Sequence, residues 1–145
     1  MLTIEHLNCG YGKHEILHDI SVTIPDKKIT AIVGQSGCGK TTFLKTLNRM
    51  VEEEQGYTTG KISLGDADIK SISKETLRSR IGMVFQSFNL FNNMTVLENC
   101  LVGQTKVLKK DPKEAEEVAM KYLTKVGMAP YINARPRQLS GGQKQ

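Results

Sequence analysis

The sequence predicts an α/β protein with strands concentrated in its first third and helices after residue 86. Residues 20–24 alternate apolar and polar side chains, which is the period of a half-buried strand. Residues 40–51 instead repeat apolar side chains at helical spacing. A glycine-rich segment at 34–41 separates an apolar run from this helix, and strand–loop–helix junctions of this kind are typical of α/β folds.

The first 86 residues are expected to hold the strands. Leu2, Ile4 and Leu7 are spaced by polar residues, and the glycines around Tyr11 signal a turn. Residues 29–33 form a nearly continuous apolar run, as expected of a strand buried on both faces. Beyond the helix at 40–51 we expect a polar loop at 52–59, strands at 60–64 and 81–85, and a short helix at 74–80.

The remainder is expected to be helical. Residues 95–98 (TVLE) form a capping box, in which two side chains each accept a hydrogen bond from an otherwise unpaired backbone N–H. An aspartate and a proline at 111–112 predict the start of a second helix, which Gly127 ends. Residues 140–143 repeat the S-x-x-Q capping pattern, so we expect a third helix to begin there, within five residues of the end of the chain.

The composition is that of an ordinary globular protein, with 39% hydrophobic and 24% charged residues. No apolar run approaches the ~20 residues of a membrane-spanning helix, and the first residues lack the pattern of a secretory signal, so we expect a cytosolic protein. Three cysteines (Cys9, Cys38 and Cys100) show no metal-ligand spacing, which favours reduced thiols. The net charge of +5 suits a polyanionic partner, although the basic residues are scattered.

The strongest chemical signal is a full match to G-x-x-x-x-G-K-[ST] at residues 34–41. Its glycines let the backbone wrap a phosphate closely, with N–H groups pointing inward. Lys40 would place its ammonium on the β- and γ-phosphates, the Thr41 hydroxyl would ligate Mg²⁺, and the positive end of the following helix would add to the attraction. The predicted ATP-binding residues of this segment are Gly34, Gln35, Ser36, Gly37, Cys38, Gly39, Lys40, Thr41 and Thr42.

Cys38 lies inside this loop. The simpler interpretation is that only its backbone matters, as for any small residue. A second hypothesis is that the nearby helix end makes its thiol reactive, in which case maleimide would label Cys38 and MgATP would protect it.

A second motif indicates which class of ATPase this is. The sequence LSGGQ lies about 100 residues beyond Lys40, at Leu139, Ser140, Gly141, Gly142 and Gln143. This pair of motifs resembles the ATP-binding subunits of ABC transporters, and the resemblance covers the whole chain. By that resemblance Tyr11 matches the aromatic residue that stacks on adenine, and Gln86 matches the glutamine near Mg²⁺ and the attacking water. On the residues alone, alternatives remain. Tyr11 could be a turn residue, Gln86 a polar strand end, and residues 140–143 only a capped helix start.

The resemblance implies a P-loop NTPase fold of the ABC type, with an N-terminal antiparallel β portion, a helical subdomain and missing C-terminal core strands. It divides the chain into a β portion with the P-loop core (1–86), a helical subdomain (87–138) and the signature with the start of its helix (139–145). It also implies ATP and Mg²⁺ as cofactors, with Thr41 and Gln86 near the metal. The implied partner is a second ATPase subunit, either another copy of this chain in a homodimer or a paired subunit, whose P-loop ATP is covered by this chain's signature, and no nucleic acid is expected.

Residues 87–95 mix aromatic and apolar side chains without a period. They are either a locally packed loop or, by the resemblance, the surface that grips a transmembrane permease subunit at the inner face of the plasma membrane. The sequence at residues 89–91 and 95–99 is most similar to that of importers of polar amino acids, whereas the sequence at 47–50 is more similar to that of phosphate importers. We favour amino acids on this basis.

The residues that hydrolyse ATP in this family are not found here. In the family an apolar strand ending in Asp-Glu follows the signature, with a histidine beyond it. The nearest candidate strand ends at Asp66, is too polar, is followed by Ala67 and precedes the signature, while all three histidines (His6, His14 and His18) precede the P-loop. We therefore expect a truncated chain that alone is poorly soluble or partly unfolded, binds ATP weakly and does not turn over, since general-base positioning is worth ~10²–10⁴ in rate.

Two functional classes thus remain: the energy-coupling ATPase subunit of an ABC importer, and a non-hydrolysing nucleotide-binding fragment. An ABC-type ATPase of DNA repair or chromosome handling is disfavoured, because neither heptads nor paired cysteines lie between the two motifs. A dinucleotide-binding oxidoreductase is disfavoured because a lysine and threonine at 40–41 would have no role in it.

Overall fold

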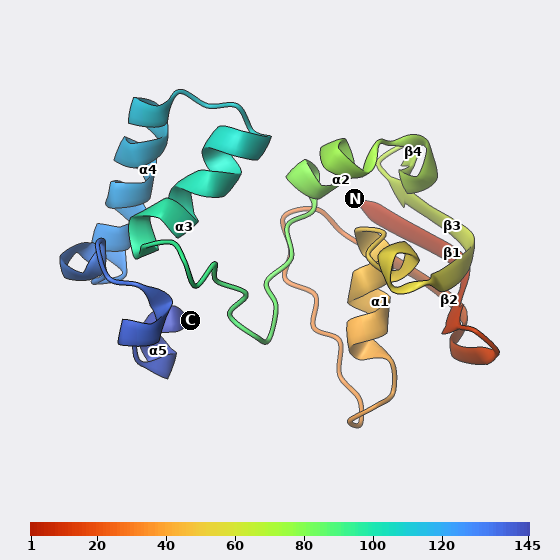
Figure 1. Cartoon of the computed structure of the whole chain (residues 1–145). Coiled ribbons are helices and arrows are strands. Elements are labelled where there is room, and N and C mark those ends of the chain that lie inside the picture. The colour runs from red at the N-terminus through yellow and green to blue at the C-terminus, as the bar shows by residue number, and fades with distance from the viewer. The chain divides into compact units, whose positions relative to one another are not determined.

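The computed structural model describes residues 1–145, which form two compact units, Met1–Met83 and Val84–Gln145 (Figure 1). The first unit contains the only sheet, and the second is helical. The predicted finer division at residues 87 and 139 stays a prediction.

The first unit is built on a four-stranded antiparallel sheet. Its strands are β1 (Leu2–Tyr11), β2 (His14–Ile24), β3 (Gly56–Leu64) and β4 (Ala67–Asp68), in the order β2-β1-β3-β4. A two-residue turn joins β1 to β2 where the glycines around Tyr11 predict one. The expected N-terminal antiparallel β portion is therefore confirmed.

A β-bulge in this sheet needs a glycine. The pairing of β1 with β3 shifts register between Glu5 and Asn8, where His6 has a φ of 49°. Opposite the bulge, Gly60 has a φ of 83°, and a Cβ there would collide with the carbonyl oxygen of His6. Only glycine satisfies both conditions, so the glycine at this position allows the register shift between the two strands.

Helix α1 (Lys40–Leu47) packs on the sheet through Phe43 and Leu47, which join a core that includes Ile4 and Leu7. The expected helix at 40–51 is too long. The chain turns after Leu47, where Arg49 has a φ of 58°, and continues as the short 3₁₀ helix η1 (Val51–Glu54). The expected loop at 52–59 is also partly wrong, because its last four residues extend β3.

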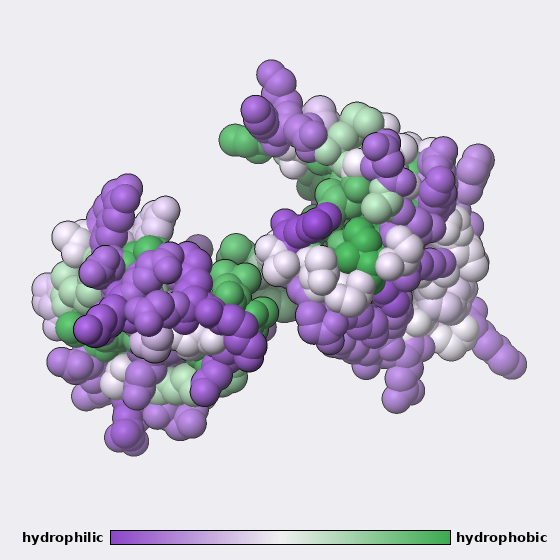
Figure 2. All heavy atoms as spheres, turned by 90° about the horizontal axis from the view of Figure 1, so that it is seen from above, coloured by the Kyte–Doolittle hydropathy of each residue, from purple (hydrophilic) through white to green (hydrophobic).

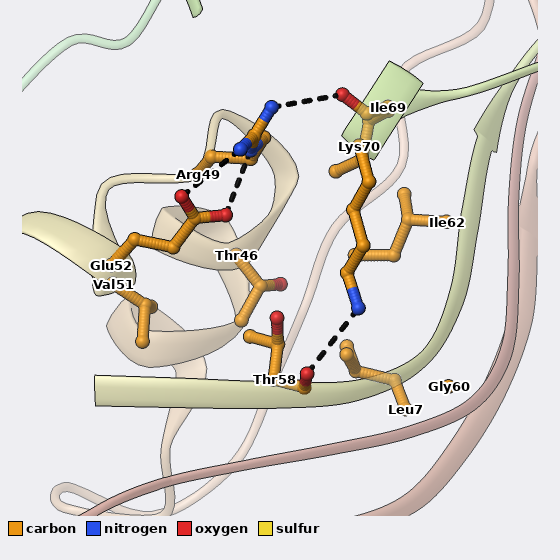
Figure 3. Close-up of a pocket in the computed structure, with 10 residues that line it drawn as sticks. All are labelled: Leu7, Thr46, Arg49, Val51, Glu52, Thr58, Gly60, Ile62, Ile69 and Lys70. Atoms are coloured by element: carbon orange, nitrogen blue, oxygen red, sulfur yellow. Dashed lines mark hydrogen bonds and ion pairs between the residues drawn. The ribbon is translucent and has the colours of Figure 1, made fainter. Parts of the chain in front are cut away.

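The turn after α1 is fastened by a partly buried charge pair (Figure 3). The Arg49 guanidinium donates to both carboxylate oxygens of Glu52, at 2.7 and 3.1 Å, and to the carbonyl oxygens of Ile69 and Ile72. Those carbonyls belong to and follow the 3₁₀ helix η2 (Ile69–Ser71), which leads into α2 (Lys74–Arg80). The cavity beside Arg49 measures about 10 Å³, so it holds at most one water.

Two predicted strands are not formed. Residues 29–33 and 81–85 pair with no neighbour, and Ile29, Val33 and Val84 are almost fully exposed. Extended backbone becomes a strand only when an adjacent strand takes up its N–H and C=O groups, and the sheet of this chain offers none to these segments. Figure 2 shows that hydrophobic residues reach the surface on both units.

The second unit consists of helices, and a side chain caps the N-terminus of each of its three α-helices. Its elements are α3 (Val96–Val102), the π-helical turn η3 (Gly103–Val107), α4 (Pro112–Lys125), η4 (Ala129–Tyr131), η5 (Pro136–Gln138) and α5 (Gly141–Lys144). The predicted capping boxes at 95–98 and 140–143 are both present, and Asp111 caps α4 as expected. The core of this unit gathers Val96, Leu123 and Leu139.

None of these helices combines the length and the apolar character that crossing a lipid bilayer requires.

Candidate nucleotide-binding site

The glycine-rich segment leads directly into α1. Gly39 is the N-cap of that helix, with a φ of 93°, and Gly37 has a φ of 83°. Within residues 34–39 the one backbone hydrogen bond runs from the Cys38 N–H to the Gln35 carbonyl, at 3.4 Å. Most amides of the loop and of the first turn of α1 are therefore free to donate to an anion.

The Lys40 ammonium lies against this loop. Its Nζ donates to the carbonyl oxygens of Gly34 at 2.9 Å and of Gln35 at 2.6 Å, and lies 3.7 Å from the Sγ of Cys38. The loop thus curls around its own lysine and holds a positive charge beside the free amides. This is the arrangement that an anion with several oxygens requires.

Two glycines of the loop lie where a Cβ would meet a neighbouring side chain. A Cβ at Gly34 would lie 2.8 Å from the Sγ of Cys38, and a Cβ at Gly39 would lie 2.9 Å from Leu17 Cδ2 and 3.0 Å from Ile16 Cγ2. In contrast, a Cβ at Gly37 would meet nothing within 4 Å. The loop is therefore packed on the side of β2 and open at Gly37, as a phosphate cradle must be.

The expectation of a strand before the loop is wrong, because residues 29–33 are not hydrogen-bonded into a sheet. Residues 30–33 instead line a hollow of about 490 Å³ together with side chains of β2, Lys40 and Phe43. The helix after the loop forms as predicted.

Tyr11 lies at the end of β1, on the edge of the first core. Its hydroxyl donates to Glu54 Oε2 at 2.8 Å, and its ring lies against the backbone of Gly56, where a Cβ would be 2.8 Å from Tyr11 Cε1. Partial burial, together with the Glu54 carboxylate, raises the pKa of Tyr11 to about 12. The raised pKa reflects partial burial and also the hydrogen bond that the protonated hydroxyl donates to Glu54.

The two side chains predicted near Mg²⁺ are both exposed. Thr41 is the second residue of α1, next to Lys40. Gln86 belongs to the second unit and does not follow a strand, so its predicted setting at a strand end is wrong. No cluster of three or more His, Cys, Asp or Glu side chains offers a metal site elsewhere. The hydroxyl and phosphate oxygens of a bound nucleotide would suit Mg²⁺, which prefers hard oxygen ligands.

The LSGGQ segment opens α5. Ser140 Oγ accepts from the Gln143 N–H at 3.3 Å, and Gln143 Oε1 accepts from the Ser140 N–H at 2.9 Å. Leu139 is buried in the core of the second unit, whereas Gly141 and Gly142 are exposed. The leucine thus anchors the motif, and the exposed glycines have no side chains of their own to cover the first backbone N–H groups of α5.

Sequence reasoning missed the residue that holds the loop before α3. The Asn99 amide donates to the carbonyl oxygens of Phe91, Met94 and Thr95, and its Oδ1 accepts from the Phe91 N–H at 2.8 Å. An asparagine inside a helix is a weak signal for such a role, since its side chain readily bonds to nearby backbone. Phe88 and Phe91 remain about half exposed on this fastened loop.

Comparison with known proteins places these motifs in a family. A family profile described as ABC transporter matches residues 17–145, most of the chain. The chain belongs to the ABC transporter family. Among curated members of this family, it is 44% identical to the arginine transport ATP-binding protein ArtM of Bacillus subtilis, and 40% identical to the glutamate/aspartate import ATP-binding protein GltL of Escherichia coli. In both cases the whole chain is covered.

The chain spans about 60% of the length of these ABC transporter relatives. Its fold matches that of a dimeric bacterial ABC transporter cassette with a TM-score of 0.81 and 25% identity, over 99% of this chain and 65% of the other. A dimeric ATP-binding cassette in a post-hydrolysis state, bound to ADP and Pi, gives the same TM-score at 24% identity. The expected ABC-type fold is therefore confirmed.

Proposed function

We propose that this chain binds MgATP at residues 34–41, as part of the ATP-binding, energy-coupling subunit of an ABC transporter. The observation that supports this most is the position of the Lys40 ammonium, 2.9 and 2.6 Å from two carbonyl oxygens of a glycine loop whose amides are largely unpaired. A lysine held in this way adds charge without closing the loop, because a Cβ at Gly37 would still meet open space.

In this proposal the loop amides and Lys40 hold the β- and γ-phosphates, and the α1 N-terminus adds its partial positive charge. The Thr41 hydroxyl would hold Mg²⁺, which supplies charge neutralisation of the phosphates when bound. Tyr11 would stack on the adenine. The chain's own contribution is thus to bind and orient the nucleotide.

Amino-acid import is the transport process that we propose. The relatives named above are an arginine transport protein and a glutamate/aspartate import protein, and a glutamine transport ATP-binding protein of Geobacillus stearothermophilus is 41% identical. The solute itself is chosen by other subunits in this family, so these names support the class of solute and not one amino acid.

The second unit would supply the partner contacts. We propose that Ser140–Gln143 covers ATP held by a second ATPase subunit, since Gly141 and Gly142 are exposed at the start of a helix. We propose further that the loop 87–95, fastened by Asn99, receives a permease subunit at the inner face of the plasma membrane. The half-exposed Phe88 and Phe91 support this role, because aromatic side chains are favoured in protein interfaces.

The residues that hydrolyse ATP in this family are not found among these 145 residues. The sequence has no Asp-Glu pair, and its three histidines all precede residue 34. We propose that the chain alone binds MgATP without turning it over, while the family as a whole couples hydrolysis to transport. The alternative function, a non-hydrolysing nucleotide-binding fragment, rests on the same observation.

Isothermal titration with MgATP tests the binding proposal. Lys40→Ala should weaken binding by at least about tenfold, because charge-assisted hydrogen bonds are worth ~1.5–3 kcal/mol. Lys61→Ala is the matched control, since Lys61 is exposed on β3 and away from the loop. Equal affinities for the two variants, or no binding by the unaltered chain, would overturn the proposal.

A further inference from the structure

A line of three polar side chains connects the two ends of the proposed nucleotide site within the first unit. Glu54, at the end of η1, accepts from the Tyr11 hydroxyl at 2.8 Å through Oε2 and from Lys45 Nζ at 2.5 Å through Oε1. Lys45 lies on α1, the same helix that begins with Lys40. The carboxylate therefore bridges the end of β1 and the phosphate-side helix.

Each member of this triad is held in place. The side chain of Lys45 is 24% exposed, and that of Glu54 is 40% exposed, so neither is fully free in solvent. Tyr11 lies at the last residue of β1, and its backbone pairs with Gly56 of β3. Only a glycine leaves room for the ring there, because a Cβ at position 56 would meet both Tyr11 and Val51.

The hydrogen bond removes the main freedom that the tyrosine has left. A tyrosine at the rim of a core can swing about its first side-chain torsion, and ordering it on ligand binding costs free energy. A hydroxyl bound to a fixed carboxylate loses this freedom before the ligand arrives. The carboxylate is fixed in turn because Lys45 holds its other oxygen.

We propose that Glu54, held by Lys45, is a positioning residue that orients Tyr11 for stacking on the nucleotide base and couples the base end of the site to helix α1. The inference rests on the proposed nucleotide-binding function and deepens it. It predicts that Glu54 affects recognition of the base and leaves recognition of the phosphates unchanged.

The triad also has a purely structural interpretation, in which Glu54 only fastens η1 to α1. The two roles differ in what they affect. A fastener of η1 would change the affinity for every ligand or only the stability of the fold. A positioning residue changes the affinity for ligands with a base, and it does so only through the Tyr11 hydroxyl.

The test compares MgATP with magnesium tripolyphosphate, which lacks the base, on the full chain. Tyr11→Phe and Glu54→Ala should each weaken MgATP binding about three- to tenfold, the range of one net hydrogen bond, and change tripolyphosphate binding by less than about twofold. The double variant should be no weaker than either single variant, because both remove the same interaction. Glu53→Gln is the matched control. Glu53 is next to Glu54 in the sequence, but its carboxylate pairs with Arg78, outside the triad.

A second readout needs no nucleotide. In an alkaline titration of tyrosinate absorbance, the tyrosine with a pKa of about 12 should disappear in Tyr11→Phe and move toward the ordinary 10 in Glu54→Gln. Glu54→Gln keeps the shape of the side chain, so it serves if Glu54→Ala does not fold.

Several outcomes would overturn the inference: equal losses for both ligands, additive losses in the double variant, or an unchanged titration in Glu54→Gln. The proposed function fails separately, if the unaltered chain shows no MgATP binding that depends on Lys40.

Discussion

Replacing Gly39 by alanine should destabilise the first unit more than the same change at Gly37. Both glycines have positive φ, 93° and 83°, where a residue with a Cβ is strained by ~1–3 kcal/mol. At position 39 the new methyl would also lie 2.9 Å from Leu17, which is 5% exposed and has little room to move. Overpacking of this kind costs ~1–3 kcal/mol, and reduced entropy of the unfolded chain returns ~0.4–1 kcal/mol.

The expected loss of unfolding free energy is therefore about 2–5 kcal/mol for Gly39→Ala and about 1–2 kcal/mol for Gly37→Ala, where the methyl meets open space. Urea unfolding without nucleotide, followed by far-ultraviolet circular dichroism, measures both. With a slope of ~1–3 kcal/mol per molar urea, the midpoint of Gly39→Ala should lie clearly below that of Gly37→Ala at an unchanged slope. Equal midpoints would show that Gly39 is not packed against β2, and the described loop geometry would be wrong.

Three further predictions concern other parts of the chain. Thr95→Ala removes the N-cap of α3 and should speed hydrogen exchange of its first amides by the equivalent of ~0.5–2 kcal/mol; unchanged protection would contradict the capping box. The hydrogen bond from Arg49, with help from Lys74, holds the pKa of Glu52 below its usual 4.5, so its stabilising effect is present above that pH and is lost as the pH falls through the lowered value. Acid titration of stability should thus be flatter in Glu52→Gln, and parallel curves would count against the pair. Maleimide should label the exposed Cys38, and MgATP should slow the labelling, whereas equal rates would place the nucleotide elsewhere.

Local patterns predicted the second unit well. The capping boxes at 95–98 and 140–143 and the aspartate–proline start at 111–112 each appear where the sequence indicates them. These signals are local, since a side chain three residues away satisfies a backbone N–H without any tertiary contact. The antiparallel pairing of β1 and β2 was predictable for the same reason, because a short turn joins them.

The errors fall where a strand depends on a distant partner. The apolar runs at 29–33 and 81–85 have the composition of buried strands, but composition does not say which segment pairs with them, and none does here. The end of α1 at Leu47 was missed because Arg49 takes a positive φ, which an arginine in a sequence does not predict. Its pairing with Glu52 and two distant carbonyls becomes apparent only in three dimensions.

In the candidate site too, the local motifs were predicted and the contacts between distant segments were not. The loop at 34–41 and the LSGGQ segment are contiguous motifs, so the sequence alone indicated them. The partners of Tyr11 could not be predicted, because Glu54 and Lys45 lie 43 and 34 residues away from it in the chain, and only the pairing of β1 with β3 brings η1 to the tyrosine. Asn99 escaped notice for a similar reason, since its partners lie on an irregular loop.

In the proposed function the backbone of residues 34–41 cradles the phosphates of a nucleotide. Amide chemical-shift mapping with MgATP can show whether these residues contact it. We predict that the largest shifts fall on the amides between Ser36 and Thr42, and that Lys40→Ala needs at least about tenfold more MgATP to reach the same shifts. Shifts confined to other segments, or the same titration midpoint in Lys40→Ala, would contradict this placement of the nucleotide.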